Sequence, residues 1–253
     1  MFHDAIKARY PDMNIVASVA VTEWTNPRAG ILEDIHLYLT STEMIQYFSW
    51  ADNFPRDHGI FVGEYAAIKD RQGGDVEINE PTLESATSEA VMILGLERNS
   101  DVVRGFAHGA LLKSLHDEPD NHVAMMKHAP ETIVYSLSYY VAKLFSTNYG
   151  TETVATSGDS GFGPLYWSTT KNDSGTYFVK IVNYDGAEST PITVDLPGNT
   201  RQATLKTFTA PNQFSTNTLG NTQGVWSETT IQRGSDGFTF TLAGRFIVAV
   251  LVV

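Results

Sequence analysis

A single carboxylate, Glu64, follows an apolar run in which Ile60, Phe61 and Val62 are consecutive β-forming residues. Such a run predicts a strand buried on both faces, and Gly63 lets the backbone approach a neighbouring group closely. Glu64 is expected at the C-terminal end of this strand. In a parallel barrel that end faces the active site, so a carboxylate there is a candidate for catalysis. The alternative is a structural glutamate that caps the next helix or pairs with a nearby Arg or Lys.

A second polar set lies on the preceding predicted strand. Asp34, His36 and Tyr38 alternate with apolar residues, so these three side chains share one face of the strand. If the two strands are parallel neighbours, His36 and Tyr38 lie near Glu64 at the mouth of a barrel. There they can orient the carboxylate and hydrogen-bond a hydroxylated substrate. The alternative is that they fill the barrel interior with their polar atoms satisfied.

The segments that must position these residues alternate between strand-like and helix-like patterns. The predicted strands are residues 14–21, 34–39, 60–64 and 101–103, and the predicted helices are residues 2–10, 42–50, 84–96 and about 107–115. This alternation predicts βα units and a parallel sheet. A closed (β/α)₈ barrel needs eight strands and typically ~250 residues. Residues 1–150 are therefore expected to form only the C-terminal half of an α/β TIM barrel, about its last four βα units, with the first half missing.

The pattern changes at about Thr151, where short alternating runs replace helical periodicity. Turn signals such as Asp185-Gly186, Pro197-Gly198 and Asp236-Gly237 separate these runs. Regularly spaced short strands predict an all-β sandwich, here of jelly-roll type, over residues 151–253. No low-complexity linker precedes it, so it is expected to pack directly on the barrel.

The composition limits the possible partners. Seventeen Lys and Arg against 29 Asp and Glu give a net charge of −12, without a basic cluster. Nucleic acid and anionic membranes both need a basic face, so neither is an expected partner. A neutral substrate such as a sugar is compatible with this charge, and Trp24, Trp50, Trp167 and Trp226 are available to stack on sugar rings or to pack in the core. No apolar run approaches the ~20 residues that span a bilayer.

Metal chemistry is not expected. The chain has no cysteine, which excludes a thiolate metal site and a cysteine nucleophile. His116, His122 and His128 recur at a spacing of six residues. That spacing is about 1.7 helical turns and places successive members on nearly opposite helix faces.

The two polar strands together resemble glycoside hydrolase family 51, the α-L-arabinofuranosidases, and in particular the fungal ones. The resemblance rests on Asp34-x-His36-x-Tyr38 followed by Phe61-Val62-Gly63-Glu64-Tyr65-Ala66. Segments 96–101, 138–146 and 163–167 also fit the family. The resemblance implies a secreted retaining glycosidase that releases terminal non-reducing arabinofuranosyl residues from arabinan or arabinoxylan. It implies neither a cofactor nor a metal.

By this resemblance Glu64 is the nucleophile, and His36 and Tyr38 bind the substrate. The family's acid/base glutamate lies in an upstream Gly-Asn-Glu segment, which does not occur here. The chain alone is therefore expected to have weak or no activity, since both carboxylates are needed for efficient turnover. His108 occupies a position that is aromatic in fungal relatives. The alternatives are a non-catalytic carbohydrate-binding protein, an inert truncated protein, and a related barrel glycosidase with another sugar specificity.

Overall fold

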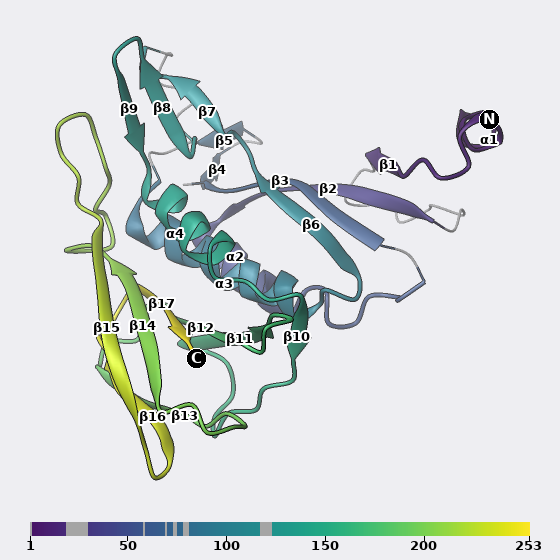
Figure 1. Cartoon of the computed structure of the whole chain (residues 1–253). Coiled ribbons are helices and arrows are strands. Elements are labelled where there is room, and N and C mark those ends of the chain that lie inside the picture. Colours follow the sequence, from purple (N-terminus) through teal and green to yellow (C-terminus); the bar gives the residue numbers. More distant parts are fainter. Residues whose placement is uncertain are drawn as a thin grey trace.

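A parallel sheet, a layer of helices and a large antiparallel sheet follow one another through the molecule (Figure 1). The computed structural model describes residues 2–18, 30–57, 59–68, 70–72, 75–77, 81–116 and 123–253. None of the described helices is long and apolar enough to cross a membrane.

The parallel sheet has four strands in the order β1-β2-β3-β6. Their bounds are Ile15–Ser18 (β1), Ile31–Thr40 (β2), Gly59–Ile68 (β3) and Val103–His108 (β6). Each neighbouring pair is parallel. The predicted parallel βα arrangement of this part of the chain is confirmed.

Three strands extend further than the sequence predicted: β2, β3 and β6. Strand β6 begins at Val103, the last residue of the predicted strand over residues 101–103. Glu64 does not end its strand, because β3 continues to Ile68 and pairs with β2 as far as Thr40↔Ile68. The register between β3 and β6 shifts between Val62 and Tyr65, so Glu64 lies at an irregularity within the strand. Such irregularities redirect a side chain without ending the ladder.

The predicted helix over residues 107–115 is wrong. Residues up to His108 belong to β6, and the chain then enters β7 (Leu112–Ser114), which pairs with β8 (Met126–Ala129). β9 (Thr132–Tyr135) completes this small sheet. The ladders to β3 and β8 supply the backbone hydrogen bonds that a helix would otherwise form internally. Gly105 allows the close approach of β3, since a Cβ at this position would lie 2.9 Å from the Phe61 ring.

The helices lie on one side of the parallel sheet. They are α2 (Ser41–Gln46), the 3₁₀ turn η1 (Tyr47–Ser49), α3 (Leu83–Arg98) and α4 (Leu137–Ser146), while α1 (Phe2–Arg9) precedes β1. Thr40 and Glu43 form a capping box at the start of α2. Thr82 and Ser136 cap α3 and α4, each accepting a hydrogen bond from the backbone three residues later. Side-chain caps of this kind satisfy amide groups that the helix leaves unpaired.

Helix α3 has almost no solvent-exposed face, because it lies between the two large sheets. All its residues from Leu83 to Leu96, apart from Glu84, are buried. Gly95 packs directly against the backbone of Phe48 in η1. A helix covered on all sides needs apolar residues around its whole circumference, which explains why its sequence is weakly amphipathic.

The C-terminal sheet has eight antiparallel strands in the order β10-β11-β12-β17-β14-β15-β16-β13. They are β10 (Glu152–Val154), β11 (Leu165–Lys171), β12 (Tyr177–Asn183), β13 (Thr190–Val194), β14 (Gln202–Thr209), β15 (Val225–Gly234), β16 (Gly237–Leu242) and β17 (Ile247–Val252). The sheet folds back on itself, so that Val179, Leu205 and Leu251 pack with Phe238 and Phe240. The predicted change to a mostly β C-terminal region is confirmed.

A separate hairpin, β4 (Asp70–Gln72) and β5 (Asp75–Glu77), follows β3.

The face of the C-terminal sheet that is turned toward the helices forms one hydrophobic core with them. Phe178, Val182, Phe208 and Val248 belong to the same buried cluster as the apolar residues of α3 and α4.

A buried ion pair crosses this junction. Lys180 on β12, with a side chain 1% exposed, pairs with Glu97 of α3. The Ser168 hydroxyl donates to the other oxygen of the Glu97 carboxylate at 2.7 Å. The helix layer and the C-terminal sheet are therefore joined by both apolar packing and a charge pair.

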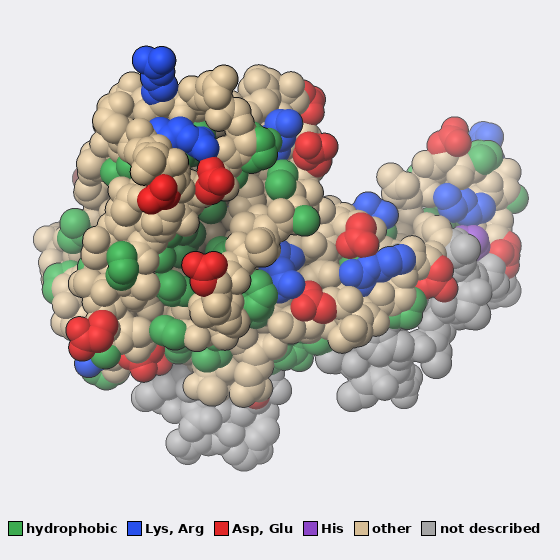
Figure 2. Space-filling view, turned by 90° about the horizontal axis from the view of Figure 1, so that it is seen from below, with side chains coloured by type: hydrophobic (Ala, Val, Ile, Leu, Met, Phe, Trp, Pro, Cys, Tyr) green, Lys and Arg blue, Asp and Glu red, His purple; other side chains and the backbone are tan. Residues whose placement is uncertain are grey.

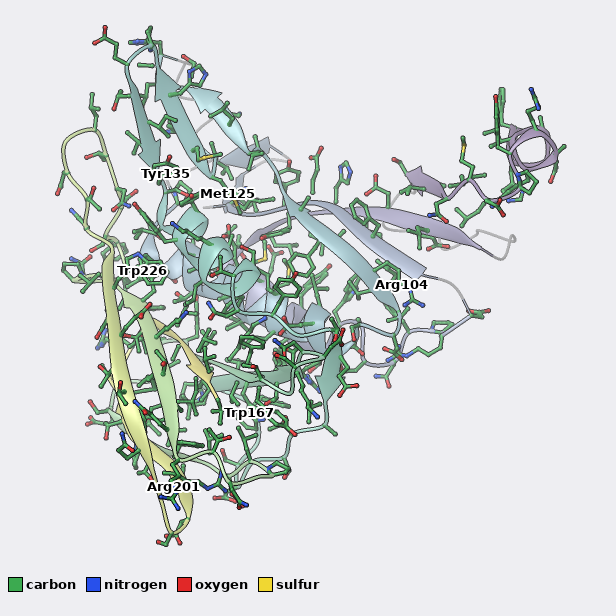
Figure 3. All side chains as sticks on the ribbon, viewed as in Figure 1. Arg104, Met125, Tyr135, Trp167, Arg201 and Trp226 are labelled. Carbon is green, nitrogen blue, oxygen red and sulfur yellow. The ribbon has the colours of Figure 1, made fainter. Side chains whose placement is uncertain are left out.

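The face seen in Figure 2 carries Lys and Arg side chains dispersed among Asp and Glu. Strand β1 carries no charged residue, and β6 carries Arg104, which Figure 3 shows toward the start of the strand.

Candidate active site

The half-exposed face of the parallel sheet brings Tyr38 and Glu64 into direct contact. The Tyr38 hydroxyl donates a hydrogen bond to Glu64 Oε2 at 2.5 Å. Burial, and then the hydrogen bond and charge of Glu64, raise the pKa of Tyr38 above that of an ordinary tyrosine. The phenol therefore keeps its proton and acts as a donor to the carboxylate.

His36 lies beside the same carboxylate. The β2–β3 register pairs His36 with Glu64, and His36 Nδ1 is 3.5 Å from Glu64 Oε2. His36 Nε2 is 3.3 Å from Asp34 Oδ2. The side chains of His36 and Glu64 are each 44% exposed, so a molecule on this face of the sheet can reach both.

Asp34 accepts a hydrogen bond from the backbone just before Glu64. Its Oδ1 accepts a hydrogen bond from the Gly63 amide at 3.1 Å, and its Oδ2 accepts one from the Ser18 hydroxyl at 3.0 Å. Residue 63 must be glycine here, because a Cβ would overlap Asp34 Oδ1. The sequence predicted that Asp34 lies on the same face of β2 as His36 and Tyr38, but it did not predict that Asp34 binds the Gly63 amide. Its place two residues before His36 was the only feature that pointed to the site.

The end of β6 closes one side of the site. The Gly109 amide donates to the Tyr65 carbonyl at 2.9 Å. A Cβ on Gly109 would lie 2.5 Å from Tyr38 Oη and 3.2 Å from Glu64 Cβ. This close backbone contact limits the movement of both side chains, and the sequence reasoning missed it.

His108, which the resemblance matches to an aromatic position, points to the opposite face of the sheet. Its side chain is 1% exposed, and Nε2 lies 3.4 Å from Glu89 Oε1 on α3. The same Glu89 oxygen accepts a hydrogen bond from the Ala67 amide at 2.9 Å. His108 is therefore part of the packing between sheet and helices and does not line the face that carries Glu64.

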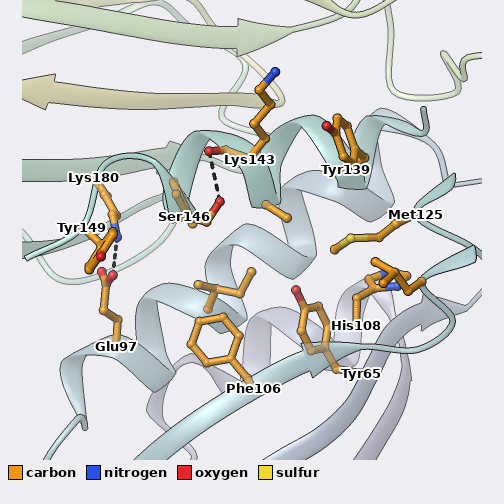
Figure 4. Close-up of a pocket in the computed structure, with 14 residues that line it drawn as sticks. Tyr65, Glu97, Phe106, His108, Met125, Tyr139, Lys143, Ser146, Tyr149 and Lys180 are labelled. Carbon is orange, nitrogen blue, oxygen red and sulfur yellow. Dashed lines mark hydrogen bonds and ion pairs between the residues drawn. The ribbon is translucent and has the colours of Figure 1, made fainter.

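A groove of about 580 Å³ lies on this helix-facing side, between the sheet and α4 (Figure 4). Tyr65, Phe106 and His108 line it from the sheet, and Tyr139 and Lys143 line it from α4. Glu64 is not among its lining residues, so the groove is separate from the carboxylate site.

The tryptophans within the described residues pack against other aromatic rings. Trp50 packs against Phe54 with ring centroids 4.5 Å apart, and Trp167 against Phe162 at 4.3 Å. Trp226 lies 4.9 Å from Phe208. Figure 3 places Trp167 and Trp226 in the C-terminal sheet. Of the two roles considered for the tryptophans, these three pack against aromatic rings of the protein itself. Trp24 lies outside the described residues.

Among the residues that the structure describes, no group of three or more His, Asp or Glu side chains is arranged to hold a metal ion. Of the three regularly spaced histidines, His128 belongs to β8 and His116 follows β7. His122 lies outside the described residues.

Glycosidases act through carboxylates, and this parallel sheet presents one, Glu64, in contact with a tyrosine and a histidine. Comparison with known proteins specifies the family. The model of the α-L-arabinofuranosidase C-terminal domain matches residues 63–245, and the chain belongs to this family. The resemblance to glycoside hydrolase family 51 predicted from the sequence is confirmed.

Curated relatives include α-L-arabinofuranosidase A of Aspergillus kawachii, 36% identical over 257 residues, and that of Aspergillus niger, 35% identical over 257 residues. Both alignments cover 99% of this chain and 38% of the relative. The chain thus spans well under half the length of the curated relatives it matches.

Among solved structures, the arabinose-bound MgGH51 α-L-arabinofuranosidase superposes with a TM-score of 0.86 at 30% identity, covering 99% of this chain and 41% of that one. The arabinose complex of the Thermotoga maritima α-L-arabinofuranosidase gives a TM-score of 0.78 at 16% identity, covering 99% and 59%. The second comparison shows a shared fold.

Proposed function

We propose that this chain is the C-terminal part of a retaining α-L-arabinofuranosidase, with Glu64 as its nucleophile. The observation that carries the proposal is the 2.5 Å hydrogen bond from Tyr38 to Glu64 on a half-exposed sheet face. In this proposal residues 1–150 are the last four βα units of a (β/α)₈ barrel. Residues 151–253 are its C-terminal jelly-roll-like β-sandwich.

In the first step the Glu64 carboxylate attacks the anomeric carbon and forms a glycosyl ester while the glycosidic bond breaks. Tyr38 and His36 both contact Oε2, which orients the carboxylate and assigns the attack to Oε1. Tyr38 retains its proton because its pKa is raised, so it continues to donate as the charge on the carboxylate changes. His36, at the exposed rim, hydrogen-bonds a sugar hydroxyl.

The departing alkoxide needs a proton, which a second carboxylate about 5–5.5 Å away supplies in retaining enzymes. That residue has no counterpart in this sequence, since no Gly-Asn-Glu segment occurs. The acid/base therefore comes from a barrel half outside this chain. Without it, the chain forms the glycosyl ester only from substrates whose leaving group departs unprotonated.

The proposed substrates are terminal non-reducing α-L-arabinofuranosyl residues of arabinan and arabinoxylan, processed by a secreted enzyme. Relatives named α-L-arabinofuranosidase and a related structure with bound arabinose support this class. No cofactor is required for the proposed chemistry.

The test is a single-turnover reaction with 2,4-dinitrophenyl α-L-arabinofuranoside, whose leaving group needs no protonation. We expect release of at most one equivalent of dinitrophenolate and a single pentosyl adduct on the peptide that contains Glu64, found by mass spectrometry. The variant Glu64→Gln should abolish the adduct, and Glu152→Gln, at an exposed position on β10, is the matched control. An adduct that persists in Glu64→Gln would contradict the assignment.

The same assay separates the alternatives. A 4-nitrophenyl arabinofuranoside, with a poorer leaving group, should give little turnover. Labelling by the corresponding xyloside in place of the arabinofuranoside would indicate a barrel glycosidase of different specificity. Binding of arabino-oligosaccharides without any labelling would indicate a non-catalytic carbohydrate-binding protein.

A further inference from the structure

Asp34 has no part in the proposed chemistry, although its carboxylate binds side chains and backbone from three strands. Its Oδ1 accepts a hydrogen bond from the Gly63 amide on β3 at 3.1 Å, and its Oδ2 accepts one from the Ser18 hydroxyl on β1 at 3.0 Å. His36, on the same strand as Asp34, has its Nε2 3.3 Å from Oδ2. The Asp34 side chain is only 15% exposed, so these contacts replace water around its charge.

An irregularity in the β2–β3 ladder explains why the Gly63 amide needs a side-chain acceptor. Asp34 is opposite Phe61 and His36 is opposite Glu64, so two steps along β2 match three steps along β3. An extra residue in one strand disrupts the regular backbone pairing at that point. Within this interval the Gly63 amide donates to Asp34 Oδ1. The same carboxylate therefore contacts the backbone before Glu64 and, through Oδ2, one nitrogen of His36.

The hydrogen bonds of Asp34 determine which nitrogen of His36 carries a proton. An ionised carboxylate only accepts hydrogen bonds, and the Ser18 hydroxyl and the Gly63 amide already donate to this one. The His36 nitrogen that bonds Oδ2 must also be a donor, which places a proton on Nε2. Nδ1, 3.5 Å from Glu64 Oε2, is then the nitrogen that remains for Glu64 and for a sugar.

We propose that Asp34 is a positioning residue, which holds the proton of His36 on Nε2 and leaves Nδ1 as an acceptor beside Glu64. This role depends on the proposed function of Glu64. In the neutral ring Nδ1 has no proton, so it accepts a hydrogen bond from a sugar hydroxyl, and Glu64 Oε2 keeps Tyr38 as its donor. A second donor on Oε2 would stabilise the carboxylate charge before the attack and slow the reaction.

The variant Asp34→Asn tests this role with little change in shape. Its Oδ1 still accepts from the Gly63 amide, while an NH₂ group replaces Oδ2. The Ser18 hydroxyl turns to accept from that group, because a hydroxyl both donates and accepts. His36 Nε2 must then accept as well, so the proton of the neutral ring moves to Nδ1, beside Glu64 Oε2. An Asp-to-Asn exchange next to a histidine selects the other tautomer in this way.

The tautomer is measured by ¹⁵N NMR of the histidine rings, at increasing pH until the His36 signals stop shifting. His36→Gln identifies these signals by their loss. We expect a proton on Nε2 and none on Nδ1 in the unaltered chain, and the reverse in Asp34→Asn. Asp236→Asn, at an exposed turn between β15 and β16, is the matched control and should keep the tautomer of the unaltered chain.

The consequence for Glu64 is measured by single-turnover labelling with 2,4-dinitrophenyl α-L-arabinofuranoside. We expect Asp34→Asn to be labelled at least about tenfold more slowly than the unaltered chain, because an added hydrogen bond to a charged group is strong enough for this change. Asp236→Asn should be labelled at the rate of the unaltered chain. Near-ultraviolet circular dichroism checks that the variants fold.

Three results would overturn the proposal. They are a proton on Nδ1 and none on Nε2 in the neutral His36 ring of the unaltered chain, an unchanged tautomer in Asp34→Asn, and labelling of Asp34→Asn at the unaltered rate. The first is measured on the unaltered chain and does not depend on how a variant folds. Absence of labelling in the unaltered chain would instead contradict the proposed nucleophile, and the NMR signals would still decide which nitrogen Asp34 keeps protonated.

Discussion

Replacing Lys180 by methionine should destabilise the junction between the helix layer and the C-terminal sheet. The Lys180 side chain is 1% exposed and pairs with Glu97, whose side chain is 16% exposed. Removing one member of a buried pair leaves an uncompensated charge, which typically costs 3–5 kcal/mol. Glu97 keeps its hydrogen bond from Ser168 and some solvent contact. We therefore expect the lower end of that range, about 3 kcal/mol.

Urea unfolding followed by circular dichroism measures this loss. With a slope near the upper end of the usual range, about 3 kcal/mol per molar urea, the midpoint should fall by about 1 M. The double variant Lys180→Met with Glu97→Gln leaves no unpaired charge, so it should be more stable than Lys180→Met alone. Lys171→Met, at a partly buried position on the neighbouring strand β11, is the matched single-charge control and should cost much less.

A loss below about 1 kcal/mol for Lys180→Met, the range of exposed pairs, would refute the reasoning. It would mean that water reaches the ammonium group despite its burial. A double variant less stable than Lys180→Met would also contradict it, because the cost would then come from packing and not from the charge left behind.

Three further predictions concern the site and the core. Tyr38→Phe removes a charge-assisted hydrogen bond worth about 1.5–3 kcal/mol that orients Glu64, so it should lower the rate of single-turnover arabinosyl labelling at least about tenfold while the protein stays folded. Burial raises the pKa of Tyr38, Tyr65 and Tyr184 in the folded protein. The unfolded chain therefore loses these protons first, and the free energy of unfolding should fall as pH rises above about 10, measured by urea titrations at increasing alkaline pH. Gly95→Ala should destabilise the chain by about 1–3 kcal/mol in thermal unfolding, against the usual gain from alanine in a helix, because the methyl group meets the Phe48 backbone.

The local patterns of the sequence predicted the elements with strong periodicity. Alternation in β2 placed Asp34, His36 and Tyr38 on one face, and the structure has all three on the less buried side of that strand. The apolar run before Glu64 predicted β3, and parallel pairing then brought Tyr38 to Glu64. These features depend on the two-residue period of a strand and on neighbouring order, which a sequence displays directly.

The features that the sequence did not reveal depend on tertiary contacts. Residues 107–115 include good helix formers, yet the ladders to β3 and β8 override that preference. The extension of β3 to Ile68 depends on its pairing with β2. The contact of Gly109 with Tyr38 joins segments far apart in the chain, and only the fold brings them together.

The position of β17 in the C-terminal sheet has a consequence for biosynthesis. This strand, Ile247–Val252, is inserted between β12 and β14, the centre of the eight-stranded order. Until β17 has been synthesised, β12 and β14 have no common neighbour, and the eight-stranded order cannot form. The hydrophobic core that the helices share with this sheet includes Val248 and Val250 of β17, so it is completed only when this last strand has been synthesised.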